Sequence, residues 1–275
     1  MPKVKANNVT LNYDQQGSGE PLILIPFLSA DNACYAFQVA EYAKHFTCIS
    51  VDLRGTGESD KPSAAYSTED LADDIAAFMT ALNIPSAHIT GLSLGAGTGL
   101  WLGAKYPDKV KSLSVHSGWT KTDLFIKTVV NGWQVSAKAL GSVPEMTIQN
   151  IFPWCFMPEL YAERPDYIQS ISDFVRSRPA QTVPDFILQS NAVIDHDVEA
   201  QVINITAPTQ ITFGSYDMVT STRFAFPLQE RISNTELVIF DQCAHAPNFE
   251  RVDEFNQRTL EFLQRQQSSG LGASS

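Results

Sequence analysis

The sequence predicts an α/β protein with a mostly parallel sheet, and two observations support this prediction. In residues 1–118 and 202–265, short β-prone runs alternate with longer runs of helical character, a pattern typical of strand–helix–strand units whose strands pair in parallel. Between them, in residues 119–201, the strand signal disappears and prolines interrupt a helical pattern. We therefore expect a core made of residues 1–118 and 202–265, with a helical cap of residues 119–201 inserted into it.

Local composition identifies the expected elements in order. The β-prone runs are residues 9–13, 22–25, 47–51, 88–90, 112–115, 208–214 and 236–240. The clearest helix spans residues 67–82, where Ser67 or Thr68 can cap the start, acids fill the first turn and one apolar stripe faces the sheet. A last helix is expected at residues 253–263. The small and polar residues 266–275 are expected to form a flexible tail.

The most informative stretch is residues 91–95, which read Gly-Leu-Ser-Leu-Gly between a β-prone run and a helix-compatible run. Strand, G-x-S-x-G and helix together are typical of a nucleophile elbow. A serine in so tight a turn has a strained backbone, and side chains two residues away on either side would clash, so glycine occupies both positions. The turn places the Ser93 hydroxyl over the N-terminus of the next helix, where negative charge is favoured.

A serine nucleophile needs a base, and the base needs a group that fixes its tautomer. His245 lies in a late loop directly after the β-prone run 236–240. Asp217 follows the run 208–214, at the strand end where α/β proteins build their sites. The order Ser93, Asp217, His245 is the order expected for this type of elbow. We therefore predict these three as catalytic residues.

These motifs make the chain resemble the α/β-hydrolase superfamily over about residues 8–265. Residues 52–59 (DLRGTGES) are similar to the family's D-x-R-G-x-G-x-S loop, and residues 244–250 (AHAPNFE) to its histidine loop. The resemblance implies an eight-stranded sheet that starts with an antiparallel hairpin. Within the single-cap branch, the elbow and residues 99–102 look most like the 3-oxoadipate enol-lactonases, and some acyl-homoserine lactonases also belong to the superfamily.

The resemblance also implies an oxyanion hole made of the backbone N–H groups of Leu28 and Leu94. Many relatives carry His-Gly before the first of these donors, whereas this chain has Pro26 and Phe27. Because the donor is a backbone group, the hole survives this difference. Phe27 is expected to narrow the pocket. Together with Trp119, Trp154 and Met157 of the apolar cap, it is predicted to contact the substrate, which suits an apolar acyl or alkyl chain.

Three other groups of residues have alternative interpretations. His116 ends the strand before the cap and either lines the site or packs inside. Asp123 is the chief rival to Asp217, because some relatives place the acid after that strand. The triplet 195–197 (Asp-His-Asp) resembles metal ligands, but it is expected to open a helix, where aspartates cap the N-terminus. We expect no metal and no other cofactor.

Composition narrows the possible partners. The net charge of −11 argues against a nucleic-acid partner, and a charged fraction of 18% with 44% hydrophobic residues is typical of a globular protein. No apolar run approaches the ~20 residues that span a bilayer, and residues 1–8 lack a secretory signal pattern. We expect a cytoplasmic protein that does not bind membranes. The oligomeric state stays open.

The leading interpretation is a carboxylesterase or lactonase that acts on a small ester or lactone, an acyl-homoserine lactone being one candidate. A second keeps the fold and changes the reaction to that of a C–C hydrolase, a perhydrolase or a hydroxynitrile lyase. A third is a ligand receptor on a hydrolase scaffold. Labelling by a fluorophosphonate would separate the first from the third.

Overall fold

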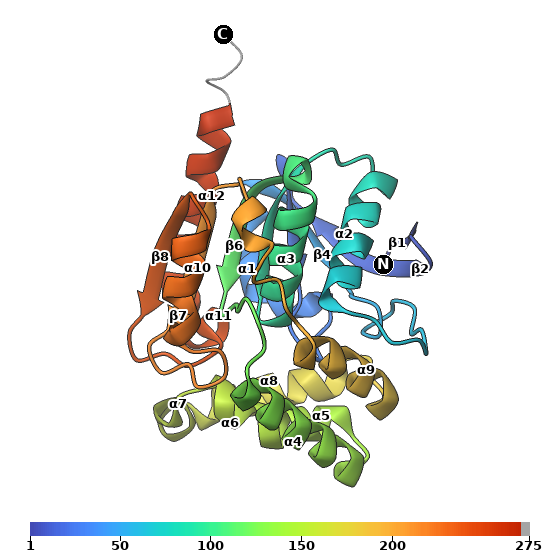
Figure 1. Ribbon diagram of the computed structural model, residues 1–275. Helices are drawn as coiled ribbons and strands as arrows, with labels where there is room; N and C mark the ends of the chain where they lie inside the picture. Colours follow the sequence, from blue (N-terminus) through green and yellow to red (C-terminus); the bar gives the residue numbers. More distant parts are fainter. Residues whose placement is uncertain (271–275) are drawn as a thin grey trace.

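The computed structural model describes residues 1–270. Within these residues the protein is built on one sheet of eight strands (Figure 1). The strands are β1 (Lys3–Ala6), β2 (Val9–Gln16), β3 (Glu20–Ile25), β4 (Phe46–Val51), β5 (Ala87–Leu92), β6 (Val110–His116), β7 (Thr209–Gly214) and β8 (Thr235–Phe240). They lie in the order β1-β2-β4-β3-β5-β6-β7-β8. The pairs β1–β2 and β2–β4 are antiparallel and all others parallel. The mostly parallel sheet and its antiparallel first hairpin are confirmed.

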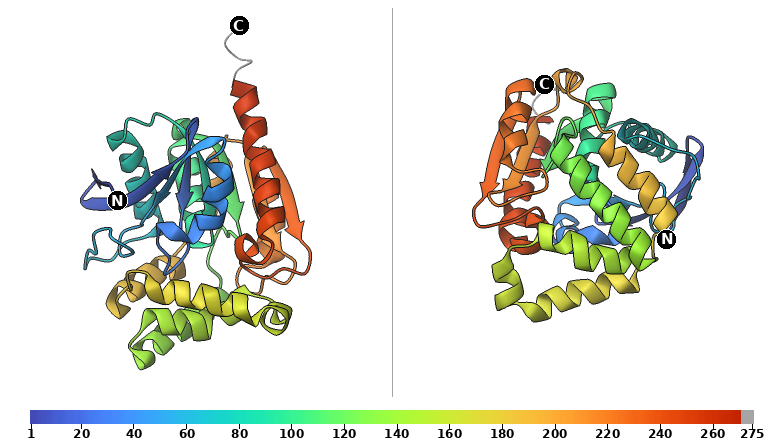
Figure 2. Two further views of the ribbon diagram at one scale, coloured as in Figure 1. Left: turned by 180° about the vertical axis from the view of Figure 1, so that it is seen from behind. Right: turned by 60° about the horizontal axis from the view of Figure 1, so that its bottom comes forward.

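Helices cover both faces of this sheet (Figures 1 and 2). One face carries α2 (Thr68–Ala81), α3 (Leu94–Lys105) and α10 (Ala225–Arg231), and the other carries α1 (Ala36–Tyr42) and α12 (Val252–Gly270). Every residue of β5 and β7 is buried, as expected for central strands covered on both sides. Short helical turns complete the core: η1 (Asn32–Tyr35), η2 (Pro107–Lys109), η4 (Val202–Asn204), η5 (Thr222–Phe224) and α11 (Pro247–Glu250).

The start of α2 shows how local sequence fixes an element. The Ser67 hydroxyl accepts the Asp70 N–H at 3.1 Å, and the Asp70 carboxylate accepts the Ser67 N–H at 2.7 Å. This reciprocal capping box satisfies two N–H groups that the helix leaves unpaired. The apolar stripe predicted for this helix lies against the sheet, with Leu71, Ile75 and Phe78 fully buried.

Between β6 and β7 the chain forms helices α4 to α9, which we call the cap (residues 124–194). They are α4 (Leu124–Leu140), α5 (Val143–Met146), η3 (Thr147–Ile151), α6 (Phe152–Cys155), α7 (Pro158–Glu163), α8 (Pro165–Ser177) and α9 (Val183–Ile194). Prolines in the sequence mark helix starts here, since α5 to α9 each have a proline in the first two positions.

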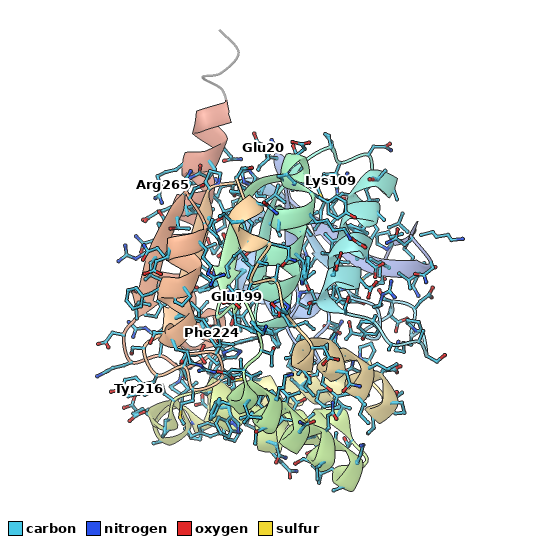
Figure 3. All side chains as sticks on the ribbon, viewed as in Figure 1. Glu20, Lys109, Glu199, Tyr216, Phe224 and Arg265 are labelled. Atoms are coloured by element: carbon cyan, nitrogen blue, oxygen red, sulfur yellow. The ribbon has the colours of Figure 1, made fainter. Side chains whose placement is uncertain are left out.

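The cap covers the end of the sheet where the parallel strands finish. In Figure 3, Glu20 at the start of β3 lies at the end of the sheet far from the cap, whereas Tyr216, two residues past β7, lies near the cap. Loops that follow the strands therefore face the cap. This is the edge at which the sequence predicts the site.

The last helix is longer than expected. Residues 266–270, predicted as the start of a flexible tail, continue α12 as far as Gly270, because glutamines at 266 and 267 are good helix formers. Residues 271–275, the rest of that predicted tail, lie outside the described residues. Within residues 1–270, no helix combines the length and apolarity needed to cross a membrane.

Candidate active site

Ser93 occupies a strained turn between β5 and α3. Its φ of 53° and ψ of −116° lie outside the regions that side-chain-bearing residues ordinarily adopt. A Cβ at position 91 would lie 2.2 Å from the Gly95 carbonyl oxygen, and a Cβ at position 95 would lie 2.1 Å from that of Ile25. Both flanking glycines are therefore required by contact with backbone, as the sequence predicts.

The turn at Ser93 leads directly into α3, and backbone N–H groups lie beside it. Leu94 is the first residue of that helix, so its N–H has no carbonyl acceptor in a preceding turn. The Ser93 N–H itself donates to the His116 carbonyl at 2.9 Å, which ties the turn to the end of β6. A free N–H beside the serine, with the positive end of the helix dipole behind it, can stabilise negative charge there.

Asp217 and His245 are joined by a hydrogen bond. Asp217 lies three residues past β7 and His245 five residues past β8, and the distance from His245 Nδ1 to Asp217 Oδ2 is 2.9 Å. Both side chains are buried, with exposed fractions of 6% for His245 and 0% for Asp217. A carboxylate at Nδ1 holds the proton there and leaves Nε2 free to act as a base.

The surroundings of Asp217 keep it ionised. The N–H groups of Val219 and Thr220 donate to Oδ1 at 2.9 and 3.0 Å, and the Thr220 hydroxyl lies 2.9 Å from Oδ2. Burial alone would raise the pKa of the Asp217 carboxyl. The charge of His245 and the hydrogen bonds from His245 and Thr220 outweigh burial and hold that pKa below its ordinary value.

The histidine loop is anchored at several points. The Ser117 hydroxyl donates to the His245 carbonyl at 2.9 Å, and the Ala246 N–H donates to the Cys155 carbonyl of the cap at 3.2 Å. The Glu250 carboxylate accepts the Ala244 N–H at 2.6 Å, and its other oxygen accepts the Met157 N–H of the cap. Burial raises the pKa of Glu250, and the two backbone donors partly offset that rise.

The loop after β3 is held by the cap as well. Ser29, with φ of 63°, donates its N–H to the Gln189 side-chain oxygen of α9 at 3.0 Å. Its hydroxyl lies 3.2 Å from that of Thr147. Leu28, which is predicted to donate to the oxyanion together with Leu94, precedes Ser29. Both Leu28 and Ser29 line the same cavity as Ser93.

This cavity has a volume of about 120 Å³ and lies between the cap and the strand ends. Ser93 and His245 both line it, while more than half of its lining residues belong to the cap and most of these are apolar. Phe27 and Trp119, two of the four predicted substrate contacts, line it. Phe27 also meets Phe249 edge to face, with ring centroids 6.1 Å apart.

Trp154 and Met157, predicted to contact substrate, do not line this cavity. The short helix α6 turns Phe152 and Cys155 toward it, and the Trp154 ring instead meets Phe125 at 6.3 Å between centroids. Met157 serves through its backbone N–H, which Glu250 accepts. The wall residues that the sequence did not single out as substrate contacts include Phe152, Phe156, Phe249 and Gln181. In short helices interrupted by prolines, the sequence does not show which side of each helix faces the cavity. These wall residues could therefore not be identified from the sequence.

The other residues with alternative interpretations have structural partners. His116 is fully buried between the hydroxyls of Thr90 and Thr212, at 2.9 and 2.7 Å, and burial lowers its pKa to about 3. Asp123 caps α4 by accepting the Ile126 N–H at 2.8 Å and pairs with Arg223 at 3.0 Å. Neither residue lines the cavity.

The triplet 195–197 ends a helix and does not open one, which corrects the expectation. Asp195 is the C-terminal cap of α9, because the chain turns there toward β7. Both ring nitrogens of His196 have partners, the Thr68 hydroxyl at 2.7 Å and the Trp119 carbonyl at 3.0 Å. Asp197 pairs with Lys121 at 2.7 Å.

Comparison with known proteins identifies the family. The family described as "alpha/beta hydrolase fold" matches residues 20–252. RutD of Pantoea ananatis, a provisionally named carbamate hydrolase, is 27% identical over 274 residues, which cover 95% of this chain and 94% of RutD. The 3-oxoadipate enol-lactonase 2 of Acinetobacter baylyi is 25% identical over 265 residues, which cover 94% and 95% of the two chains. The enol-lactonase structure from Burkholderia xenovorans LB400 superposes with a TM-score of 0.86 at 24% identity, over 96% of this chain and all of that one. With its fold, its serine turn and this match, the chain belongs to the alpha/beta hydrolase family.

Proposed function

We propose that this protein is a serine hydrolase that cleaves carboxylic esters or lactones. The observation that carries the proposal is that Ser93, on its strained turn, and His245, bonded to Asp217, line one cavity. Nucleophile, base and orienting acid are the three parts that acyl transfer by a serine requires. The lactone and carbamate hydrolase names among its relatives support a reaction at an acyl carbon.

In this mechanism His245 Nε2 takes the proton of the Ser93 hydroxyl as its oxygen attacks the substrate carbonyl. The N–H groups of Leu94 and Leu28 stabilise the oxyanion, and Asp217 stabilises the imidazolium. His245 then gives the proton to the leaving alkoxide and activates a water that hydrolyses the acyl-enzyme. A lactone differs only in that its leaving group stays attached to the acyl part. The steps use these three side chains, the two backbone N–H groups and water.

The size of the cavity restricts the substrate. A volume of about 120 Å³ is well below the ~300–1,000 Å³ typical of pockets for drug-sized ligands. A short ester or a small lactone with an apolar acyl part suits it, and a short-chain acyl-homoserine lactone stays a candidate. A C–C hydrolase would use the same three residues. We rank it second because no observation favours a carbon leaving group over an alkoxide.

A fluorophosphonate probe tests the proposal directly. Wild-type protein is expected to react at one serine, identified by mass spectrometry of the digest as Ser93, and to hydrolyse p-nitrophenyl acetate. Ser93→Ala removes only a hydroxyl and is expected to abolish labelling and lower turnover by several orders of magnitude, with an unchanged circular dichroism spectrum. Labelling at another serine, or a mutant rate above about a tenth of the parent rate, would contradict it.

A further inference from the structure

Ser117 is the first residue after β6 and lies in a strained turn. Its φ of 48° falls in the left-handed region, which residues other than glycine, asparagine and aspartate rarely adopt. Its side chain is fully buried. A turn that required only this backbone conformation would be served better by glycine. Strained residues gather at functional sites, and the hydroxyl is what serine adds at this one.

The polar groups of Ser117 bond to three segments at the strand ends. Its N–H donates to the Thr212 carbonyl of β7 at 2.8 Å. Its hydroxyl donates to the His245 carbonyl at 2.9 Å. Its carbonyl lies 3.0 Å from the Thr220 hydroxyl, and the same hydroxyl lies 2.9 Å from Asp217 Oδ2. Ser117 therefore joins the end of β6 to the loops that carry the proposed base and its acid.

The proposed nucleophile is tied to the residue before Ser117. The His116 carbonyl accepts the Ser93 N–H at 2.9 Å. The dipeptide of His116 and Ser117 thus bonds to the segments of all three predicted catalytic residues. Within this dipeptide, the Ser117 hydroxyl is the group that bonds to the histidine loop, so its loss acts on that loop first.

The position of the His245 ring depends on two fixed points. At the ring, Nδ1 is bonded to Asp217 Oδ2 at 2.9 Å. One hydrogen bond to the ring leaves the direction of Nε2 free to vary, so the main chain must be fixed as well. The N–H groups of Ala244 and Ala246 are held on either side. Within residues 1–270, the Ser117 hydroxyl is the only donor to the carbonyl of His245 itself.

Ser117 has no direct access to the substrate. It does not line the cavity, whereas Ser93 and His245 do. Its route to the reaction is therefore the placement of His245. A base must lie within hydrogen-bond reach of the proton that it takes, and a displacement of about 1 Å can cost 10²-fold in rate.

We propose that Ser117 is a positioning residue whose hydroxyl fixes the main chain of His245 so that Nε2 faces the Ser93 hydroxyl. This inference rests on the proposed function, in which Ser93 is the nucleophile and His245 its base. It assigns Ser117 no proton transfer and no contact with the substrate.

Ser117→Gly separates the hydroxyl from the turn, because glycine adopts the backbone conformation without strain and lacks the hydroxyl. With p-nitrophenyl acetate, kcat is expected to fall about 10- to 100-fold while KM changes by less than about threefold. Ser117→Ala, which loses the hydroxyl and keeps a Cβ, is expected to show a similar loss.

Ser114→Ala is the matched control. Ser114 is a fully buried residue of the same strand, β6, and its hydroxyl has no hydrogen-bond partner within residues 1–270. Removal of this hydroxyl is expected to leave kcat within about twofold of the wild-type value, since it breaks no contact with the triad.

A second background tests the route through His245. In His245→Ala the main-chain carbonyl at position 245 remains but the imidazole is gone, so the placement of this main chain no longer affects a base. Residues that act as a unit in catalysis are strongly non-additive, so adding Ser117→Gly to His245→Ala is expected to change the residual rate by less than about twofold. A residue that only supports the fold would lower the rate in both backgrounds.

Two results would overturn the inference. Wild-type kcat in Ser117→Gly would show that Ser117 serves only as a turn residue. An equal loss from Ser117→Gly with and without the His245 imidazole would assign the effect to the fold as a whole. If Ser117→Ala does not fold, Ser117→Gly still provides both comparisons, because it relieves the strained φ. Failure of the wild-type protein to react with a fluorophosphonate at Ser93 would instead refute the proposed function.

Discussion

Gly95 packs against the Ile25 carbonyl so closely that a Cβ on Gly95 would lie 2.1 Å from that oxygen. This contact presses the first turn of α3 against the end of β3, the strand that leads into the loop of Leu28. The serine turn and the predicted oxyanion loop are therefore fixed relative to each other by backbone contact. Any side chain at position 95 must move one of them.

We expect Gly95→Ala to destabilise the protein by about 1–3 kcal/mol or more, because the backbone must shift to relieve the contact. Gly132→Ala is the matched control: nothing lies within 4 Å of a Cβ there, and the position is inside α4. The control is expected to be neutral or more stable by up to ~1 kcal/mol. Urea unfolding of both variants checks this. Equal midpoints for the two alanine variants would show that the elbow tolerates a side chain.

Asp217→Asn is expected to lower kcat about 10⁴-fold, by analogy with serine proteases, because an amide no longer holds the proton on His245 Nδ1. Asp123→Asn should cost little, since asparagine also caps a helix well and the ion pair with Arg223 is part-exposed. Steady-state rates with p-nitrophenyl acetate decide between them. A large loss of kcat in Asp123→Asn with little loss in Asp217→Asn would identify Asp123 as the acid of the triad.

Two buried histidines make the fold sensitive to acid. Burial lowers the pKa of His116 to about 3 and that of His196 to about 4, whereas the unfolded chain protonates near 6.5. Their neutral forms therefore favour the fold fully above pH 6.5, and this contribution is lost as the pH falls from 6.5 toward the folded pKa values.

At pH 4.5 the loss for His116 is about 2–3 kcal/mol relative to pH 7.5. His116→Gln can keep hydrogen bonds to the two threonines without titrating. Between pH 7.5 and 4.5, the free energy of unfolding of this variant is therefore expected to decrease by about 2–3 kcal/mol less than that of the wild type. Urea titrations at pH 7.5 and 4.5 for both proteins measure the difference. An unchanged pH dependence in the variant would show that His116 takes up a proton inside the fold.

Chain length tests the apolar cavity. Each buried methylene adds roughly 0.8 kcal/mol, so kcat/KM of p-nitrophenyl esters should rise about fourfold per carbon from acetate. A cavity of ~150 Å³ holds benzene, so the rise is expected to end near about six carbons in a cavity of this size. Rates from two to twelve carbons give the profile. A steady rise to twelve carbons would require a longer channel, and a monotonic fall from acetate would mean that no apolar acyl pocket is used.

Much of the fold and the placement of the three predicted catalytic residues could be read from the sequence, because short motifs determine them. The tight turn at Ser93 demands glycine at fixed spacing, and the strands before Asp217 and His245 are rich in β-branched and aromatic residues. By contrast, β1 is short, half-exposed and carries Lys3 and Lys5, as edge strands often do, so it leaves almost no pattern.

The substrate-facing side of the cap could not be read in this way. Whether Trp154 or Phe152 faces the cavity depends on the rotation of a four-residue helix, which packing of the whole cap decides. The hydrogen bonds that hold Gln181 at the cavity wall reach Gly55, 126 positions away, and Gln189 in the next helix. Such contacts form only after distant segments meet.

The carboxylate of Glu250 joins the cap at Met157 to the histidine loop at Ala244. The cap is therefore not an independent module that could be exchanged between relatives to change specificity. A chimera with a cap from another protein must also place a backbone N–H where that of Met157 lies. Without this donor, one oxygen of Glu250 loses its hydrogen bond, and the histidine loop loses a contact with the cap. We expect productive chimeras to be those in which cap and histidine loop are transplanted together.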